Sequence, residues 1–173
     1  MEKIGVIVNP VASNGKGLKE FKEIEGFLNS LQQKPKIFFT EFPKHAIELA
    51  KNAFNEGYNR IISFGGDGTH NEVLNGILFG AEEKFKKSIF EFRETEINQI
   101  PTLGVVSIGS GNDFRKTLKL PKDILSSLKI ALSNKGKFID VGYFEYVDFE
   151  GIISKRFFLN ILSGGFSGAV TEK

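Results

Sequence analysis

The chain has 173 residues, of which 40% are hydrophobic and 25% are charged, and its formal net charge at pH 7 is +2. This composition is typical of a globular chain and excludes a disordered one, while the small net charge gives nucleic-acid binding no support. Cysteine is absent, which excludes disulfides and thiolate metal sites and fits a reducing compartment. No apolar run reaches the roughly 18 residues of a membrane span, so we predict a cytoplasmic protein and leave peripheral membrane contact open.

Short apolar runs rich in β-branched residues alternate with segments of helical spacing. The apolar runs predict strands over residues 4–8, 37–40, 60–64 and 102–108. The helical spacing predicts helices over residues 18–31, 44–56, 69–78 and 121–133, the second of them ended by Gly57 as a C-cap. The charged residues 81–99 predict an irregular, partly helical excursion. Buried strands joined by helices favour a parallel sheet with right-handed crossovers, so residues 1–135 are predicted to form an α/β domain of Rossmann-like character.

The pattern changes after Gly136. Residues 137–146 alternate with period two, residues 148–151 are typical of a turn, and residues 152–162 predict a second strand. We therefore expect residues 136–173 to be the first strands of a β-sandwich domain that stops before it is complete. A lone hairpin leaves strand edges unpaired, so association into oligomers is left open.

Polar, glycine-bearing loops follow three of the predicted strands. They cover residues 9–17, 65–72 and 109–114. In an open α/β sheet ligands bind outside the carboxyl ends of the strands, where all three loops would emerge. Glycine lets backbone N–H groups approach a phosphate, and a helix starting at Thr69 would add the positive end of its dipole. Together the loops predict a phosphate-binding cleft, although none has the spacing of a Walker A loop.

Asp67 is the acidic residue among the glycines of the second loop. A carboxylate beside a phosphate site is explained by a bridging cation or by proton transfer, so Asp67 is a candidate Mg²⁺ ligand and a candidate general base. The structural alternative is an N-cap for the helix that follows. For Lys16 a flexible turn is favoured over a phosphate contact. For His70 a helix-surface or capping role is favoured over that of a catalytic base.

These motifs together resemble the diacylglycerol kinase catalytic domain, the family that also holds sphingosine kinases, ceramide kinases and bacterial lipid kinases. The resemblance rests on Asn9-Pro10, on Gly-Gly-Asp-Gly-Thr at 65–69 with Asn-Glu-Val-Leu-Asn-Gly at 71–76, and on Gly-Ser-Gly-Asn-Asp-Phe at 109–114. It continues in residues 139–142, 158–160 and 164–166, and so covers essentially the whole chain. The motif at 65–69 alone is shared with NAD kinases.

What the resemblance implies is a kinase that uses ATP and Mg²⁺ and phosphorylates a lipid alcohol at a membrane surface. Its α/β domain and β-sandwich domain would hold ATP between them. Asp67 is implied as the catalytic residue and as the residue near the metal, with Glu72 and Asp113 as supporting acids. The implied nucleotide-binding residues are Asn9, Pro10, Val11, Ala12, Ser13, Thr40, Gly65, Gly66, Asp67, Gly68, Thr69, His70, Asn71, Glu72 and Ser110.

The chain departs from the family pattern at several places. Ser107 stands where the third loop of the family has proline, Ser110 stands where it has threonine, and the family does not hold histidine at position 70. Family members also run well beyond 173 residues, so we expect acidic residues of the second domain to be missing, and activity of this fragment is left open. The alternatives are an NAD kinase and a non-catalytic nucleotide-binding remnant. The sequence does not name the lipid.

Overall fold

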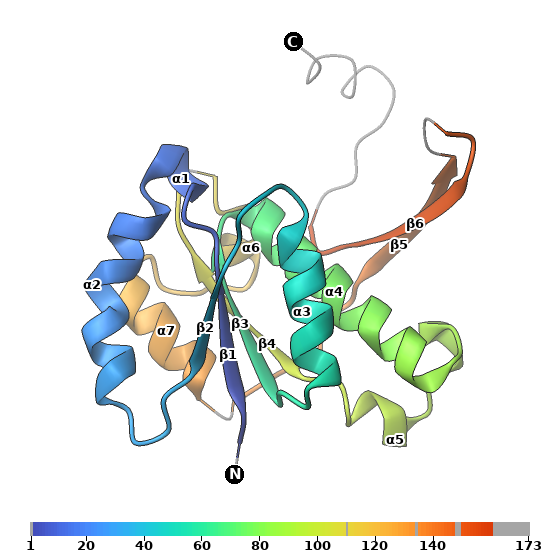
Figure 1. Ribbon diagram of the computed structural model, residues 1–173, viewed down its shortest axis with the longest axis horizontal. Helices are drawn as coiled ribbons and strands as arrows, with labels where there is room; N and C mark the ends of the chain where they lie inside the picture. The colour runs from blue at the N-terminus through green and yellow to red at the C-terminus, as the bar shows by residue number, and fades with distance from the viewer. Residues whose placement is uncertain (1, 110, 134, 148–149, 161–173) are drawn as a thin grey trace.

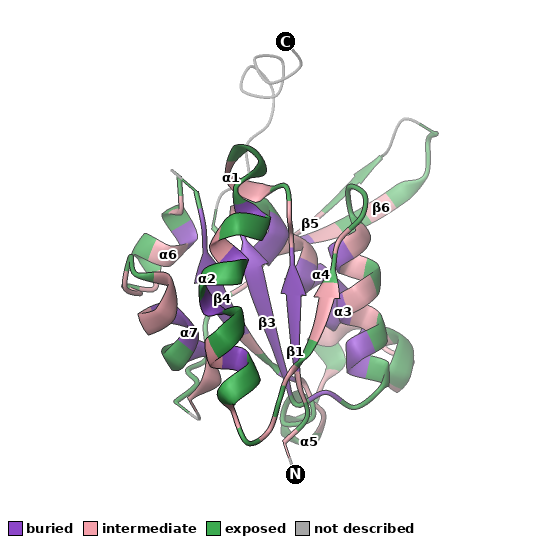
Figure 2. Cartoon of the chain, turned by 60° about the vertical axis from the view of Figure 1, so that its left-hand side comes forward, coloured by how far each residue is buried: buried purple, intermediate pink, exposed green. Residues whose placement is uncertain are grey.

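A four-stranded parallel sheet forms the centre of the protein (Figure 1). The computed structural model describes residues 2–109, 111–133, 135–147 and 150–160. The strand order is β2-β1-β3-β4, with β1 at Ile4–Val8, β2 at Lys36–Phe39, β3 at Arg60–Gly65 and β4 at Thr102–Ser107. The predicted strands are thus confirmed, and the α/β class with them. Burial in Figure 2 is concentrated on β1, β3 and β4.

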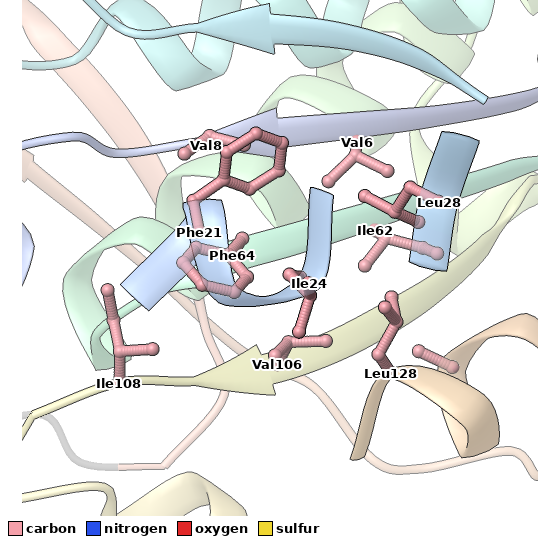
Figure 3. Packing of buried hydrophobic residues seen from close by; sticks show 11 residues of the cluster. Val6, Val8, Phe21, Ile24, Leu28, Ile62, Phe64, Val106, Ile108 and Leu128 are labelled. Atoms are coloured by element: carbon pink, nitrogen blue, oxygen red, sulfur yellow. The ribbon is translucent and has the colours of Figure 1, made fainter. Parts of the chain in front are cut away.

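One face of the sheet is covered by α2 (Gly17–Ser30) and α7 (Ile124–Leu132) (Figure 1). Side chains of α2 meet the strands in a continuous apolar layer that includes Phe21, Ile24, Val8 and Phe64 (Figure 3). Because strand side chains alternate between faces, Ile7 points to the other side. There it packs with residues of α3 (His45–Asn55) and α4 (Asp67–Phe85). The sheet is therefore buried on both faces, as its continuous apolar strands predict.

Helix α4 is longer than its sequence pattern predicts. It begins at Asp67 and extends to Phe85, into the segment predicted to be irregular. The rest of that segment holds the short helices η1 (Ile89–Glu91) and α5 (Glu94–Ile97). The boundary is missed because residues Val73 to Leu78 are all buried, so the helix lacks the one-sided apolar stripe from which its length could be inferred.

The chain leaves the sheet for an antiparallel hairpin of β5 (Gly142–Val147) and β6 (Ile153–Phe158). The predicted hairpin is confirmed, with shorter strands than expected. Its inner strand is joined to α4 by the amide of Asn75, which donates to Phe157 O at 2.8 Å and accepts from Phe157 N at 2.9 Å. Asn75 is fully buried, so this pair of hydrogen bonds fixes β6 beside α4 where water cannot compete.

Candidate functional site

All three glycine-bearing loops emerge at the carboxyl end of the sheet, as predicted. The first loop contains the short turn α1 (Ala12–Gly15), and the third leads into α6 (Asp113–Thr117), which lies at the same end of the sheet (Figure 1). Asn9 joins the first loop to the second, because its Nδ2 donates to Thr69 Oγ1 at 3.1 Å. Its Oδ1 also accepts from Val11 N at 3.1 Å, which shapes the first loop itself.

The second loop turns sharply from β3 into α4. A Cβ at Gly65 would lie only 2.5 Å from Thr69 Oγ1, so glycine is required for the first helical turn to fold back onto the strand. Gly66 is the N-cap residue and offers no side-chain cap. The amides at the start of α4 therefore keep capacity to bind an anion.

Asp67 is the first residue of α4, and its carboxylate reaches across to α6. Oδ2 accepts from Asp113 N at 3.0 Å, and Oδ1 accepts from Phe114 N at 3.3 Å. The predicted alternative, an N-cap for its own helix, is thus wrong: Asp67 caps the helix that follows the third loop. Each carboxylate oxygen keeps a free lone pair, because each accepts a single hydrogen bond from these amides.

Two hollows meet at Asp67. The larger, of about 550 Å³, is lined on the loop side by Ser13, Lys16, Gly66 and Gly109, among others. The smaller, of about 250 Å³, lies between α4, α6 and the end of the hairpin, where Asn160 and Phe158 line it. Asp67 is part of both linings. A group bound in either hollow would therefore border the same carboxylate.

The predicted residues divide by where the structure places them. Ser13, Gly66 and Asp67 line the larger hollow, and Asp67, Gly68 and Asn71 line the smaller. Asn9, Gly65 and Thr69 lie behind them in contacts that shape the loops. Neither lining includes Pro10, Val11, Ala12, Thr40, His70 or Glu72. Ser110 and residues 164–166 lie outside the described part of the chain.

Two of these outlying residues serve the scaffold. Thr40 continues from β2 at the same edge, where its N–H donates to Val8 O at 2.9 Å. Glu72 Oε1 accepts from Lys44 N at 3.3 Å and so joins α4 to the residue before α3. Lys44 has a φ of 68°, a left-handed conformation that this contact helps to hold.

His70 is not on the helix surface. Its side chain is fully buried, and its ring nitrogens contact Ser63 Oγ at 2.8 Å and Ser107 Oγ at 2.9 Å. Burial lowers the pKa of His70 to about 4, while the nearby Asp67 acts weakly in the opposite direction. The ring is therefore neutral at neutral pH. The surface and capping prediction is wrong, and the side chain does not reach either hollow.

Several lining residues were not among the predicted site residues. Asn14, Gly111 and Asn112 line the larger hollow, as does Lys16, for which a plain turn was favoured. The sequence signal for them was their place in the glycine loops. For Asn160 the signal was the motif at 158–160, yet only the folded hairpin shows that this motif closes the smaller hollow.

The oxygen donors around the smaller hollow fit a hard cation. Asp67, Asp113 and Asn71 line it, and the buried Oδ1 of Asn71 has no hydrogen-bond partner among the described residues. No cluster of three or more His, Cys, Asp or Glu side chains suited to a metal occurs in the part of the chain described. Mg²⁺ commonly takes one or two carboxylates and completes its shell with phosphate oxygens and water. These donors therefore fit an Mg²⁺ ion that also binds a phosphate. They do not form a site in which protein side chains supply all the ligands.

A family model for the diacylglycerol kinase catalytic domain matches residues 3–144. The chain belongs to this family. The match covers the three glycine-bearing loops, the helix that starts at Asp67 and the first residues of the hairpin. The resemblance inferred from the sequence motifs is therefore confirmed, and the diacylglycerol kinase family is a family of lipid kinases.

Proteins similar to this member of the diacylglycerol kinase family include a Chromohalobacter salexigens protein named "Probable lipid kinase YegS-like", 30% identical over 92% of this chain and 44% of the relative. A Staphylococcus aureus protein named "Diacylglycerol kinase" is 29% identical over 92% of this chain and 42% of its own length. A crystal structure of a diacylglycerol kinase from Bacillus anthracis is 30% identical with a TM-score of 0.57, covering 75% of this chain and 42% of that one. The chain thus spans less than half the length of these relatives.

Proposed function

We propose that the protein takes part in transferring the γ-phosphoryl group of ATP to the hydroxyl group of a lipid. The observation that carries this proposal is that Asp67 lines both hollows. The larger hollow has the glycine amides, the start of α4 and Lys16 to receive phosphates. The smaller one is also lined by Asp67 and would admit the acceptor hydroxyl. Asp67 would then stand next to both reactants of an in-line transfer, in which the attacking and leaving oxygens stand on opposite sides of phosphorus.

In this scheme the bond between the γ-phosphorus and the lipid oxygen forms as the bond to the β–γ bridging oxygen breaks, which leaves ADP. The hydroxyl proton passes to a carboxylate, and Asp67 is the proposed acceptor. The amides of Asp113 and Phe114 fix the orientation of that carboxylate. Mg²⁺, when bound, would neutralise charge on the phosphates, with Asp67 and the unpartnered Oδ1 of Asn71 as the proposed holders.

The proposed acceptor is a lipid alcohol reached from a membrane surface. Among the described residues no helix combines the length and the apolarity needed to cross a bilayer. Names of the relatives support a lipid as the acceptor class, since they are lipid and diacylglycerol kinases. We infer peripheral contact with the membrane, made when the acceptor is bound.

The proposal is tested by incubating the protein with γ-labelled ATP, Mg²⁺ and one acceptor at a time. The panel holds diacylglycerol, a sphingoid base, phosphatidylglycerol and a polyprenol in mixed micelles, with NAD as the soluble alternative. Label on a lipid is the expected result and identifies the acceptor. Label on NAD would reassign the chemistry to a nucleotide acceptor. ATP binding without transfer to any acceptor would contradict the kinase proposal and select a nucleotide-binding module.

A further inference from the structure

The buried His70 joins two strands to the first turn of α4. Ser63 belongs to β3 and Ser107 ends β4, and both serines are buried. With one hydroxyl on each ring nitrogen, His70 has both of its polar atoms partnered. A neutral imidazole donates through one nitrogen and accepts through the other, and serine hydroxyls can do either, so the whole chain of contacts can be satisfied without a charge.

Two polar residues from different motifs are in direct contact here. Both were inferred from the sequence motifs to depart from the family pattern, and His70 Nε2 lies 2.9 Å from Ser107 Oγ. Neither residue was linked to the other by its place in the sequence, since 37 positions separate them. A polar contact in the core requires both partners, because a buried donor or acceptor left alone is costly.

The contact with Ser107 places His70 at one end of the third loop, and Asp67 holds the other end. Asp67 accepts from Asp113 N and Phe114 N, while His70, one helical turn further along α4, contacts Ser107. Adjacent turns of a helix present such residues on the same face. The loop between these anchors includes Gly109 and Asn112, which line the larger hollow and have φ values of 111° and 50°. Because these loop residues have positive φ values and little side-chain bulk to pack, the position of the loop depends on the contacts at its two ends.

We propose that His70 is a positioning residue that, through Ser63 and Ser107, fixes the loop after β4 relative to Asp67. Loss of the imidazole would remove the side-chain contact at Ser107, leaving the backbone hydrogen bond from Ile108 N to Gly65 O to hold this end of the loop. We expect the hydrogen bonds that Asp113 N and Phe114 N donate to Asp67 to loosen as a result. The loss would weaken nucleotide binding without removing any group that touches the nucleotide. The expected effect on nucleotide binding rests on the proposed function, whereas the expected effect on the loop and on the hydrogen bonds to Asp67 does not.

The test compares His70→Leu, Ser107→Ala and their double variant with a matched control, Ser127→Ala. Ser127 is also a buried serine, but its hydroxyl donates to Pro121 O in the region of α7. The first readout is native-state hydrogen exchange at the amides of Asp113 and Phe114, followed by NMR, with the amide of Ile7 as the core reference. We expect exchange at the two α6 amides to accelerate about tenfold or more in His70→Leu, with no such change in Ser127→Ala.

The second readout is the dissociation constant for ATP–Mg²⁺ measured by calorimetry. We expect about a tenfold rise in His70→Leu and a smaller rise in Ser107→Ala. The double variant should match His70→Leu alone, because residues that act through one contact are not additive. If His70→Leu does not fold, Ser107→Ala carries the same comparison, since it removes a single hydroxyl.

Unchanged exchange at Asp113 and Phe114 in both folded variants would overturn the positioning role. Equal acceleration at Ile7 would do the same, because it would show that His70 merely stabilises the whole fold. If the unaltered protein does not bind ATP, the proposed function fails, and hydrogen exchange alone decides the role of His70.

Discussion

His70 gives the protein a predicted dependence of stability on acidity. Burial lowers its pKa in the folded chain to about 4, whereas an unfolded histidine has its ordinary value of 6.5. Between these two values the unfolded chain binds the proton and the folded chain does not. The free energy of unfolding is therefore fully retained above about pH 6.5, and it falls as the pH drops from there towards 4.

The size of the effect follows from the two pKa values. Linkage gives a loss of about 2 kcal/mol from this single group between pH 8 and pH 5, and about 3 kcal/mol once the pH is below both values. Small domains are stable by about 5–15 kcal/mol, so the loss is a large fraction of the total. Glu96 and Asp123 have lowered pKa values, chiefly through hydrogen bonds from Lys87 and Ser126 respectively, and lose their contributions at lower pH than His70 does.

Urea unfolding followed by circular dichroism at pH 8 and pH 5 measures the effect. The comparison is between the unaltered protein and His70→Leu, because every other side chain is common to both. His70→Leu is expected to be the less stable protein at pH 8, where Ser63 and Ser107 lose their partner. The deficit should shrink by about 2 kcal/mol at pH 5. A deficit of the same size at both pH values would refute the reasoning that the imidazole is buried and neutral.

Further predictions concern packing and charge. In Gly76→Ala the new methyl would collide with the backbone carbonyl oxygen of Ile47 and lie 2.7 Å from the methyl of Ala50, both on α3, so urea unfolding should show that the free energy of unfolding falls by about 1–3 kcal/mol or more. In the control Gly26→Ala no atom outside the neighbouring backbone of its own helix lies within 4 Å of the new methyl, and stability should hold or rise. Asn75→Ala removes both hydrogen bonds to the backbone of β6, so the hairpin amides should exchange faster, and the free energy of unfolding should fall by about 2–4 kcal/mol. Unchanged exchange of the hairpin amides would contradict the role of Asn75 in holding β6 against α4. Lys16→Ala should weaken ATP–Mg²⁺ binding by about threefold to tenfold in calorimetry without changing stability, whereas Lys19→Ala, on the neighbouring turn, should bind as the unaltered protein does.

The strands and the layered arrangement were predictable because local patterns determine them. β1 is a continuous apolar run and β3 is buried along its whole length, and strands buried on both faces occur in parallel sheets between helices. The glycines at 65 and 66 correctly marked the turn into α4, since a side chain at Gly65 would collide with Thr69. Convergence of the three loops then followed from the rule that they all leave the carboxyl ends of the strands.

The contacts that define the site were not predictable from local pattern. The partners of Asp67 lie 46 and 47 residues away, on a helix too short to be recognised from periodicity. His70 was predicted to lie at the helix surface or to cap the helix. In the structure α4 is flanked by both the sheet and the hairpin, so nearly all of its middle is buried. Histidine is usually exposed or half-exposed, and only the tertiary fold supplies the two serines that satisfy it.

If Asp67, which lines both hollows, accepts the proton in phosphoryl transfer as proposed, Asp67→Asn should abolish that transfer. Transfer of labelled γ-phosphate to the lipid that the unaltered protein labels best would be measured for both, with Asp123→Asn as the control. Asp123 undergoes the same chemical change at the N-cap of α7, a position that asparagine fills equally well. We expect Asp67→Asn to keep the fold and lose transfer, and Asp123→Asn to transfer phosphate at the rate of the unaltered protein. Turnover by Asp67→Asn at the rate of the unaltered protein would contradict the proposed role of Asp67.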